Sequence, residues 1–224
     1  MVVPGPNQKQ FIAPRPVGGS YTFGGRQGRM SPTRQRAFDL LVPRFQVEFP
    51  IPTDWPIIVE VGCGKGDATA SMAAADVGSL VIACEPNGAM VANLAVMLDE
   101  QGIDNVRLWV GDAFDVFAML GPASVAEIRI WFPDPWPKPR HAGKRLITAQ
   151  RLALMIDTLA SGGLFRLATD DVRYAEEALC AIDNEPRLVG STVGRPPGRP
   201  ITRFEARGLA EGRTVVDIEA RRIG

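Results

Sequence analysis

The chain has 224 residues, enough for one α/β domain with a full hydrophobic core, and its 25 basic and 25 acidic side chains balance. No run of eighteen apolar residues occurs, and no apolar stretch typical of a signal peptide opens the chain, so we expect neither a membrane span nor a secretory leader. Three scattered cysteines, Cys63, Cys84 and Cys180, show neither a disulfide pattern nor metal-ligand spacing. We therefore expect a reduced, cytoplasmic protein with no metal site and no membrane partner.

The balanced net charge hides a segregation of charges along the chain. Residues 1–44 hold seven basic side chains against one acid, residues 127–145 hold five against two, and residues 187–224 hold eight against four. Residues 45–126 instead hold two basic side chains against eleven acids. The basic segments are either separate solvated faces or parts of one surface that binds phosphates, and charge alone leaves both interpretations open.

Residues 1–30 are predicted to form a flexible arm, because they are rich in proline and glycine and hold few apolar side chains. Ser31 and Pro32 are typical of a helix start, with Ser31 as the N-cap, and a short helix is expected through Leu40. No internal repeat and no second domain is visible, so residues 31–224 are expected to form a single domain.

From Ile57 onward, short apolar runs alternate with helical segments. Continuous apolar strands that alternate with helices are typical of a mostly parallel sheet covered on both faces. The helices are predicted at 67–75, 87–101, 113–120, 145–159 and 171–182. The strands are predicted at 57–61, 80–84, 106–110, 127–132 and 164–168, followed by a final pair at 187–193 and 214–218. The pattern therefore predicts an α/β fold with a seven-stranded sheet.

A glycine-rich turn, from Glu60 to Gly66, joins the first of these strands to the helix that follows. Its G-x-G-x-G spacing differs from the G-x-G-x-x-G of dinucleotide binders, and it lacks the Lys-Ser/Thr ending of a phosphate-cradling loop. Glycines let the backbone turn tightly and approach a ligand closely, although a purely structural turn would use them as well.

Three acids at strand ends favour a ligand site. Glu60 precedes the glycines, Glu85 ends the second strand, and Asp112 follows the third strand and precedes Ala113. An acid in the position of Glu85 can accept both ribose hydroxyls of an adenosine cofactor, and Asp112 could accept from the adenine amino group. An acidic pocket tolerates a cation and repels a pyrophosphate, which favours S-adenosylmethionine over NAD. Taken singly, each acid also fits the role of a helix N-cap.

The most unusual segment of the chain is the run W-F-P-D-P-W-P-K-P-R-H at 131–141. Its prolines exclude a helix or a central strand, so we predict a rigid loop at the carboxyl end of a strand, where open α/β sheets bind ligands. It carries one carboxylate, Asp134, and a large flat ring, Trp136, which either stacks on a substrate or packs in the core. Phosphates are expected to meet the basic side chains Lys138, Arg140, Lys144 and Arg145.

Together these motifs resemble the tRNA (guanine-N7-)-methyltransferases, which have the Rossmann-like class I fold of S-adenosylmethionine-dependent methyltransferases. The resemblance runs from about Gly28 to Ile218. Its matching segments are Glu60–Gly66, Glu85, Asp112-Ala113, Phe132–His141, Thr169-Asp170 and Thr202–Arg207. The chain departs from the family pattern at Ala142-Gly143 and Ala206, where basic residues are common, which weakens the predicted basic surface.

The resemblance implies transfer of a methyl group from S-adenosylmethionine to N7 of a guanine in the variable loop of tRNA, by a monomer or a homodimer. It implies that Asp134 is catalytic and that the segment from Gly28 to Gln35 contacts tRNA. It implies cofactor binding by Glu60, Gly62, Gly64, Glu85, Asp112, Ala113 and Asp134, and substrate binding by Lys138, Asp170, Thr202, Arg203, Phe204 and Glu205.

Three other functions are compatible with parts of this pattern. Amino-group methyltransferases carry an Asp/Asn-Pro-Pro-aromatic loop at the same place, whereas here Trp136 stands one position earlier than that aromatic residue. A non-catalytic RNA-binding module would not need the acids of the pocket. A nicotinamide oxidoreductase would need the G-x-G-x-x-G spacing that this chain lacks.

Overall fold

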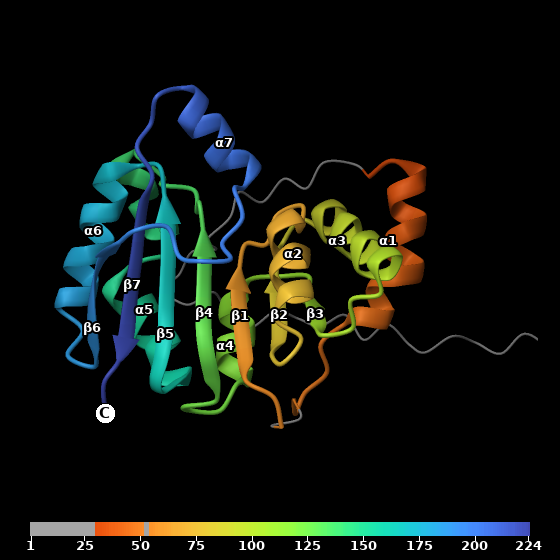
Figure 1. Cartoon of the computed structure of the whole chain (residues 1–224), viewed down its shortest axis with the longest axis horizontal. Coiled ribbons are helices and arrows are strands. Elements are labelled where there is room, and N and C mark those ends of the chain that lie inside the picture. Colours follow the sequence, from red (N-terminus) through yellow and green to blue (C-terminus); the bar gives the residue numbers. More distant parts are fainter. Residues whose placement is uncertain (1–29, 52–53) are drawn as a thin grey trace, which may run out of the picture.

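A computed structural model describes residues 30–51 and 54–224, so most of the predicted arm 1–30 lies outside the described residues. One sheet with strand order β3-β2-β1-β4-β5-β7-β6 forms the centre of the molecule (Figure 1). Strands β1 to β5 run parallel, and β7 runs antiparallel to β5 and β6. The strands are β1 (Ile57–Val61), β2 (Leu80–Cys84), β3 (Val106–Trp109), β4 (Val125–Trp131), β5 (Leu159–Thr169), β6 (Leu188–Val193) and β7 (Val216–Arg222). The predicted α/β fold with a mostly parallel seven-stranded sheet is confirmed.

Helices lie on both faces of the sheet. One face packs against the first three helices, and the other face packs against the next three (Figure 1). The helices are α1 (Pro32–Phe45), α2 (Asp67–Ala75), α3 (Gly88–Gln101), α4 (Ala113–Met119), α5 (Ala149–Thr158), α6 (Val172–Asp183) and α7 (Arg203–Ala210), and a 3-10 helix, η2, spans Pro139–Lys144. None of the described helices has the length and apolar character needed to cross a bilayer.

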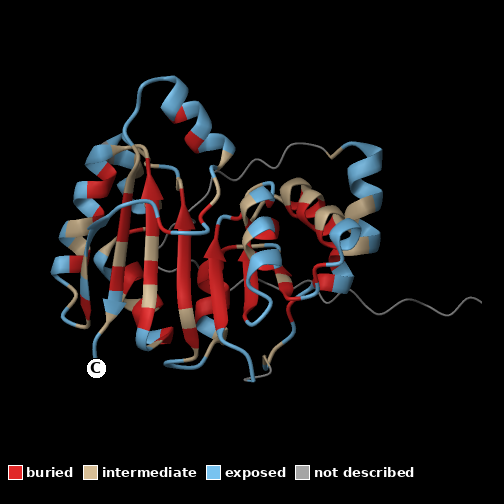
Figure 2. Cartoon of the chain, in the orientation of Figure 1, coloured by how far each residue is buried: buried red, intermediate tan, exposed pale blue. Residues whose placement is uncertain are grey.

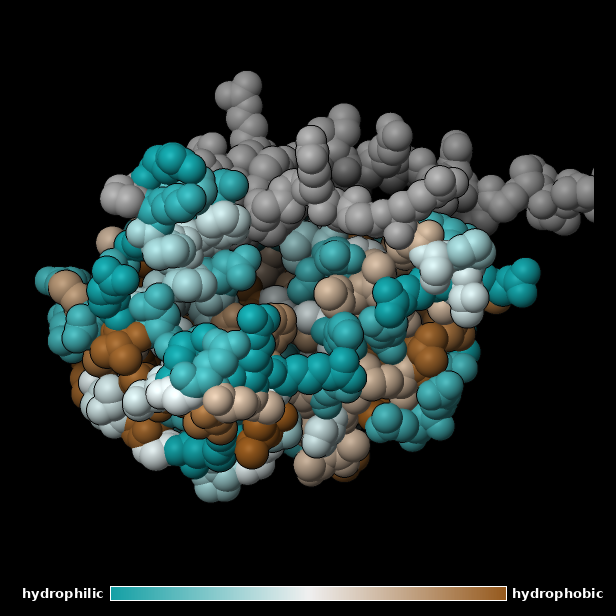
Figure 3. Space-filling view, turned by 90° about the horizontal axis from the view of Figure 1, so that it is seen from above, coloured by the Kyte–Doolittle hydropathy of each residue, from teal (hydrophilic) through white to brown (hydrophobic). Residues whose placement is uncertain are grey.

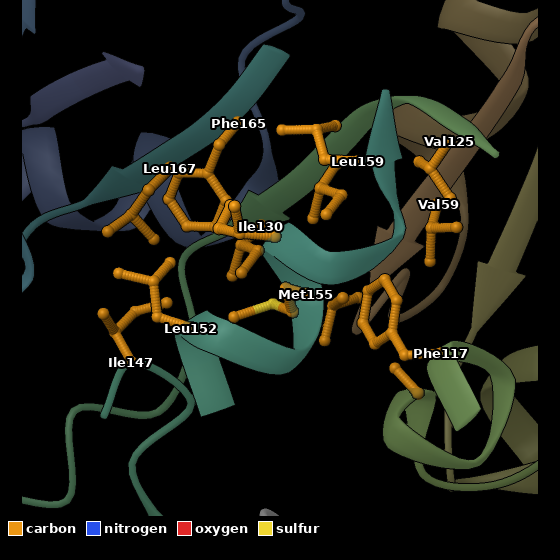
Figure 4. Packing of buried hydrophobic residues seen from close by; sticks show 14 of the residues in the cluster. Val59, Phe117, Val125, Ile130, Ile147, Leu152, Met155, Leu159, Phe165 and Leu167 are labelled. Carbon is orange, nitrogen blue, oxygen red and sulfur yellow. The ribbon is translucent and has the colours of Figure 1, made fainter. Parts of the chain in front are cut away.

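The apolar strand runs form the two layers of the core (Figure 2). On the α4–α6 side, Ile130 and Phe165 of neighbouring strands pack with Leu152 and Met155 of α5, and all four are buried (Figure 4). At about 25 cal/mol per Å² of apolar surface, each such side chain contributes about 2 kcal/mol of transfer free energy. Because both faces of the central strands are buried, their sequences are continuous apolar runs and do not alternate between apolar and polar residues.

The strand order places a ligand crevice between β1 and β4. The chain moves from β1 outward through β2 and β3, then returns to the other side of β1 to form β4. The connections after β1 and β4 therefore leave in opposite directions, and the carboxyl ends of the two strands face an open crevice. The glycine turn after β1 and the proline loop after β4 both lie there.

Two predicted boundaries near the start and middle of the chain were wrong. Helix α1 continues past Leu40 to Phe45, in spite of Pro43, because Val42 and Phe45 are buried against the sheet and α3. Helix α5 begins at Ala149 rather than at Arg145, since Thr148 caps it, its hydroxyl accepting from the Arg151 N–H at 3.3 Å.

The last strands also differ from the prediction. Strand β5 begins at Leu159, five residues earlier than expected, and includes Gly162 and Gly163 at a register shift against β4. Strand β7 runs from Val216 to Arg222 rather than over 214–218. Helix α7 was not predicted at all.

Candidate active site

A cavity of about 470 Å³ occupies the crevice at the carboxyl ends of β1 and β4. Its wall is formed by four segments that are far apart in the sequence, namely 60–68, 84–87, 111–113 and 131–134, and residues 202–204 of α7 lie at its edge. Figure 3 looks down on this edge of the sheet, where a hollow lies among hydrophilic and hydrophobic residues. The volume lies within the range of about 300–1,000 Å³ found for cofactor and small-molecule sites.

The glycine turn brings backbone rather than side chains to the cavity. Gly66 caps α2 in the left-handed region (φ 85°), and an added Cβ would lie 2.6 Å from Leu94 of α3, so no side chain fits there. Gly62 and Gly64 also have positive φ values and line the cavity. The tight turn therefore leaves room for a ligand beside the backbone.

Glu85 is held at the end of β2 by two backbone donors. Its carboxylate accepts from the Gly64 N–H at 3.1 Å and from the Asn87 N–H at 2.9 Å. Burial raises the pKa of Glu85, as does the nearby charge of Asp134, while the two N–H groups act in the opposite direction. The carboxylate is thereby fixed in orientation at the wall of the cavity.

Glu60 is an almost fully buried acid, 2% exposed, at the end of β1. Burial raises its pKa, and the neighbouring Thr69 side chain and the charge of Arg129 offset part of that rise. Among the described residues its Oε2 atom has no hydrogen-bond partner, although the residue lines the cavity. Buried polar atoms are nearly always paired, so this oxygen fits a donor on a bound ligand. A cationic ligand such as S-adenosylmethionine, with its ammonium group, suits that donor requirement.

Asp112 combines the two roles that its sequence position allowed. It is the N-cap of α4, with Oδ1 accepting from the Phe114 N–H at 3.1 Å, and it also lines the cavity together with Ala113. The cap fixes the orientation of the carboxylate, and the small Ala113 leaves space at the wall.

The proline loop after β4 turns sharply and is tied down by hydrogen bonds. Phe132 and Trp136 lie in the left-handed region, with φ values of 52° and 44°, which is uncommon for residues other than glycine. The Phe132 N–H donates to the Ala168 carbonyl at 2.7 Å. Arg145 donates to the carbonyls of Pro135 and Trp136 at 3.2 and 3.3 Å. Asp134, exposed and at the cavity wall, is therefore presented from a braced turn.

The end of this loop differs from the prediction that the run 131–141 contains no helix. The 3-10 helix η2 begins at Pro139, because proline is tolerated at the first position of a helix. The guanidinium of Arg145 also donates to Glu177 at 2.5 Å. Its donors therefore bind groups of the protein itself, whereas the sequence had suggested a contact with phosphate.

Trp136 is half-buried and packs against its own loop. The Lys144 ammonium lies 4.6 Å from the ring centroid, and the His141 ring meets it edge-on at 5.5 Å. Desolvation and the positive charges of Arg140, Lys144 and Lys138 lower the pKa of His141. The contacts favour a packing role for Trp136, one of the two roles considered from the sequence.

Helix α7 brings the late motif to the cavity. Its N-cap, Thr202, accepts from the Glu205 N–H at 3.1 Å, and Arg203 lies 3.6 Å from Asp67 at the start of α2. Phe204 is 66% exposed beside the opening. The pattern T-x-x-E at 202–205 is a capping-box signal, which would have revealed this helix in the sequence.

Three predicted substrate residues do not line the cavity. Glu205 is fully buried, and its carboxylate is bound by Arg199 at 2.7 Å and by Arg195. Asp170 is paired with Arg213 at 2.8 Å, and Lys138 is exposed at the start of η2. Arg199 was not singled out from the sequence, because it lies in a Gly- and Pro-rich stretch that resembles an exposed loop. Across the described part of the chain, no group of three or more His, Cys, Asp or Glu side chains is suited to a metal ion.

Comparison with known proteins agrees with this geometry. Residues 54–218 match the family model described as "Putative methyltransferase". The chain is 37% identical to the tRNA (guanine-N(7)-)-methyltransferase of Paraburkholderia xenovorans, covering 91% of this chain and 83% of that one. It is 39% identical to the enzyme of that name from Streptomyces coelicolor, over 75% of this chain and 64% of that one.

Solved structures support the fold alone. An rRNA methylase from Streptococcus thermophilus superposes with a TM-score of 0.53 at 14% identity, covering 88% of this chain and all of that one. A SAM-dependent O-methyltransferase from Thermotoga maritima gives 0.52 at 19% identity, covering 89% of this chain and 68% of that one. With the fold of class I methyltransferases and relatives that match along most of its length, the chain belongs to the tRNA (guanine-N7-)-methyltransferase family.

Proposed function

We propose that the protein transfers the methyl group of S-adenosylmethionine to N7 of a guanine in the variable loop of tRNA. The observation that carries the proposal is the cavity at the β1–β4 crevice, where the buried acid Glu60, the oriented acid Glu85 and the exposed acid Asp134 meet. Such a pocket suits a cationic cofactor and a base that becomes positively charged. Membership of the family supports the same substrate and reaction.

Different residues of the cavity are proposed to bind different parts of the cofactor. Glu60 is proposed to accept from the ammonium group, because its Oε2 atom is buried without a partner among the described residues. Glu85 is proposed to accept from the ribose hydroxyls, and Asp112 with Ala113 to bind the adenine. Gly62 and Gly64 allow the backbone to approach the cofactor closely.

The chemistry needs little proton transfer. When bound, the cofactor would supply a sulfonium methyl group. The in-plane lone pair of N7 forms the new bond to the methyl carbon, and the electron pair of the broken sulfur–carbon bond stays on sulfur. No general base is required, because that nitrogen carries no proton. The braced loop around Asp134 then contributes mainly by fixing the geometry of the reactants. The Asp134 carboxylate stabilises the positive charge that develops on the guanine ring or accepts from its N–H edge.

The substrate is proposed to reach the cavity from the side of α7. The target base lies within folded RNA, so it is drawn out of its stack. The exposed Phe204 ring beside the opening is suited to stack on a base, and Arg203 and Lys138 to meet phosphates. Asp170 and Thr202 are further candidates for substrate contact. We assign all these roles to one domain, 31–224, acting on tRNA in the cytoplasm as a monomer or a homodimer.

Methyl transfer from labelled S-adenosylmethionine to unmodified tRNA, followed by nucleoside analysis, tests the proposal. Label in N7-methylguanosine is the expected result. Label on an exocyclic amine would instead assign an amino-group methyltransferase. Cofactor binding without any label would favour a non-catalytic RNA-binding role.

A further inference from the structure

A second cavity of about 420 Å³ lies beside the first, between the start of α1, the glycine turn and α3. It shares Lys65, Asp67 and Arg203 with the cofactor cavity, so the two cavities adjoin at the glycine turn and the start of α7. Helix α3 lies between α2 and α1 at this corner of the molecule (Figure 1). The floor is formed by small and apolar side chains of α1 and α3.

Basic side chains dominate the rim of this groove. Arg34 of α1, Lys65 of the glycine turn and Arg203 of α7 converge on it from three different elements. Asp67 is the only acid among the described residues of the lining, and its charge is offset by Arg203 at 3.6 Å. Neither Arg34 nor Lys65 forms an ion pair with another described residue. The groove therefore carries an excess of positive charge that no other described residue neutralises.

Helix dipoles act in the same direction. Three helices begin at this groove, α1 at Pro32, α2 at Asp67 and α7 at Arg203. Their N-termini each carry a partial positive charge of about half an elementary charge. Thr33 and Asn93 add a hydroxyl and an amide donor to the lining. Together with the basic side chains, these groups suit an anion with several acceptor oxygens.

We propose that this groove binds a backbone phosphate of the tRNA, next to the nucleotide whose base enters the cofactor cavity. The inference rests on the proposed function, because it takes RNA as the substrate. The shared Lys65 and Arg203 place the phosphate at the border of the two cavities, close to the target base. A contact there holds the strand while the base leaves its stack, since phosphate contacts set register and orientation.

Removal of one charge from the groove tests the proposal, and the chain offers a matched control. Arg34 and Arg36 are both exposed arginines of α1, but they lie two positions apart on different sides of the helix, and only Arg34 lines the groove. Arg34→Ala and Arg36→Ala change the net charge equally. The affinity for unmodified tRNA is measured by filter binding between about 50 and 200 mM salt, with S-adenosylhomocysteine present.

The expected result is a loss of affinity of about fivefold for Arg34→Ala, with a salt slope smaller by about one, and a change within about twofold for Arg36→Ala. Asn93→Glu, which adds a carboxylate to the floor, is expected to weaken binding at least as much as Arg34→Ala. Equal slopes for Arg34→Ala and Arg36→Ala would overturn the groove assignment. A larger effect of Arg34→Ala on cofactor affinity than on tRNA affinity would overturn it as well, by assigning the groove to the cofactor.

The two proposals fail in different ways. In one case, tRNA binding depends on salt and is reduced only by Arg34→Ala and Asn93→Glu, but no label enters N7-methylguanosine. This result supports the groove as a phosphate site and contradicts the proposed function. In the other case, the protein methylates N7 of guanine, but Arg34→Ala and Arg36→Ala bind tRNA equally well. This result supports the proposed function and contradicts the groove assignment. Wild-type protein that does not bind tRNA at any salt concentration removes both.

Discussion

Arg199 and Glu205 form an ion pair that is sealed from solvent, with Nη1 2.7 Å from Oε2 and side-chain exposures of 1% and 0%. Arg199 also contacts Asp217 of β7 at 2.8 Å, and its guanidinium lies 5.7 Å from the ring centroids of both Trp131 and Phe132. One buried guanidinium thus connects α7, β7 and the start of the proline loop. The position of Thr202, Arg203 and Phe204 at the cavity depends on this connection.

Replacement of Arg199 by methionine is expected to lower the free energy of unfolding by about 3–5 kcal/mol, because it leaves two buried carboxylates without their main partner. Urea denaturation measures this loss. Glu211→Gln is the control, since Glu211 pairs with Arg207 and Arg213 at the surface and its replacement should change the free energy of unfolding little. A loss for the Arg199 variant as small as that expected of the surface control would show that the buried cluster does not stabilise the fold.

Glu60→Gln is expected to act in opposite directions on cofactor binding and on stability. Loss of the carboxylate should weaken S-adenosylmethionine binding by about 30-fold, the value of one charged hydrogen bond of about 2 kcal/mol. The cofactor-free protein should become more stable at neutral pH, because burial raises the pKa of Glu60 and so opposes its ionised form. Calorimetric titration and thermal unfolding measure the two effects, and a fall in stability with unchanged cofactor affinity would assign Glu60 to the fold alone.

Asp134→Ala is expected to abolish methyl transfer while cofactor affinity stays within about tenfold, or about 1.4 kcal/mol. The residue is exposed on a turn that is held by other hydrogen bonds, so its removal should not disturb the fold. Asp134→Asn keeps the shape without the charge and separates positioning from electrostatic stabilisation. Turnover retained by the alanine variant would remove Asp134 from the mechanism.

Asp115 should make the protein less stable as the pH rises from about 4 to about 6. Burial, with a contribution from Asp112, raises the pKa of Asp115 to about 6. The folded state therefore binds more protons than the unfolded state in this window, so the free energy of unfolding falls with rising pH and levels off above it. Asp115→Asn should match the wild type near pH 4 and exceed it by about 1–2 kcal/mol at pH 7. A constant difference between the two proteins across that range would contradict the assignment.

The central part of the fold was predictable because its signals are local. Ile57–Val61, Asp67–Ala75 and Leu80–Cys84 have the bounds that the apolar runs and the glycine turn indicated. The cofactor wall followed from the same signals, since acids placed at the ends of parallel strands must meet at one edge of the sheet.

The remainder depends on contacts between distant residues. Arg199 lies in a segment whose composition resembles a solvated loop, and its burial results from Glu205 and from Asp217, eighteen positions later. Likewise, Glu205 belongs to a motif that the resemblance assigns to substrate, yet its carboxylate lies inside the cluster. Composition and spacing cannot show which of two equally charged residues the fold will enclose.

The position of β7 has a consequence for synthesis. β7 follows the other six strands in the chain, but it lies inside the sheet, between β5 and β6. The ribosome therefore releases β1 to β4, and with them most of the cofactor wall, before the strand that anchors Arg199 through Asp217 exists. Because a domain generally folds as a unit, the nascent chain should acquire neither the complete sheet nor the ordered α7 until β7, which ends at Arg222, has been synthesised.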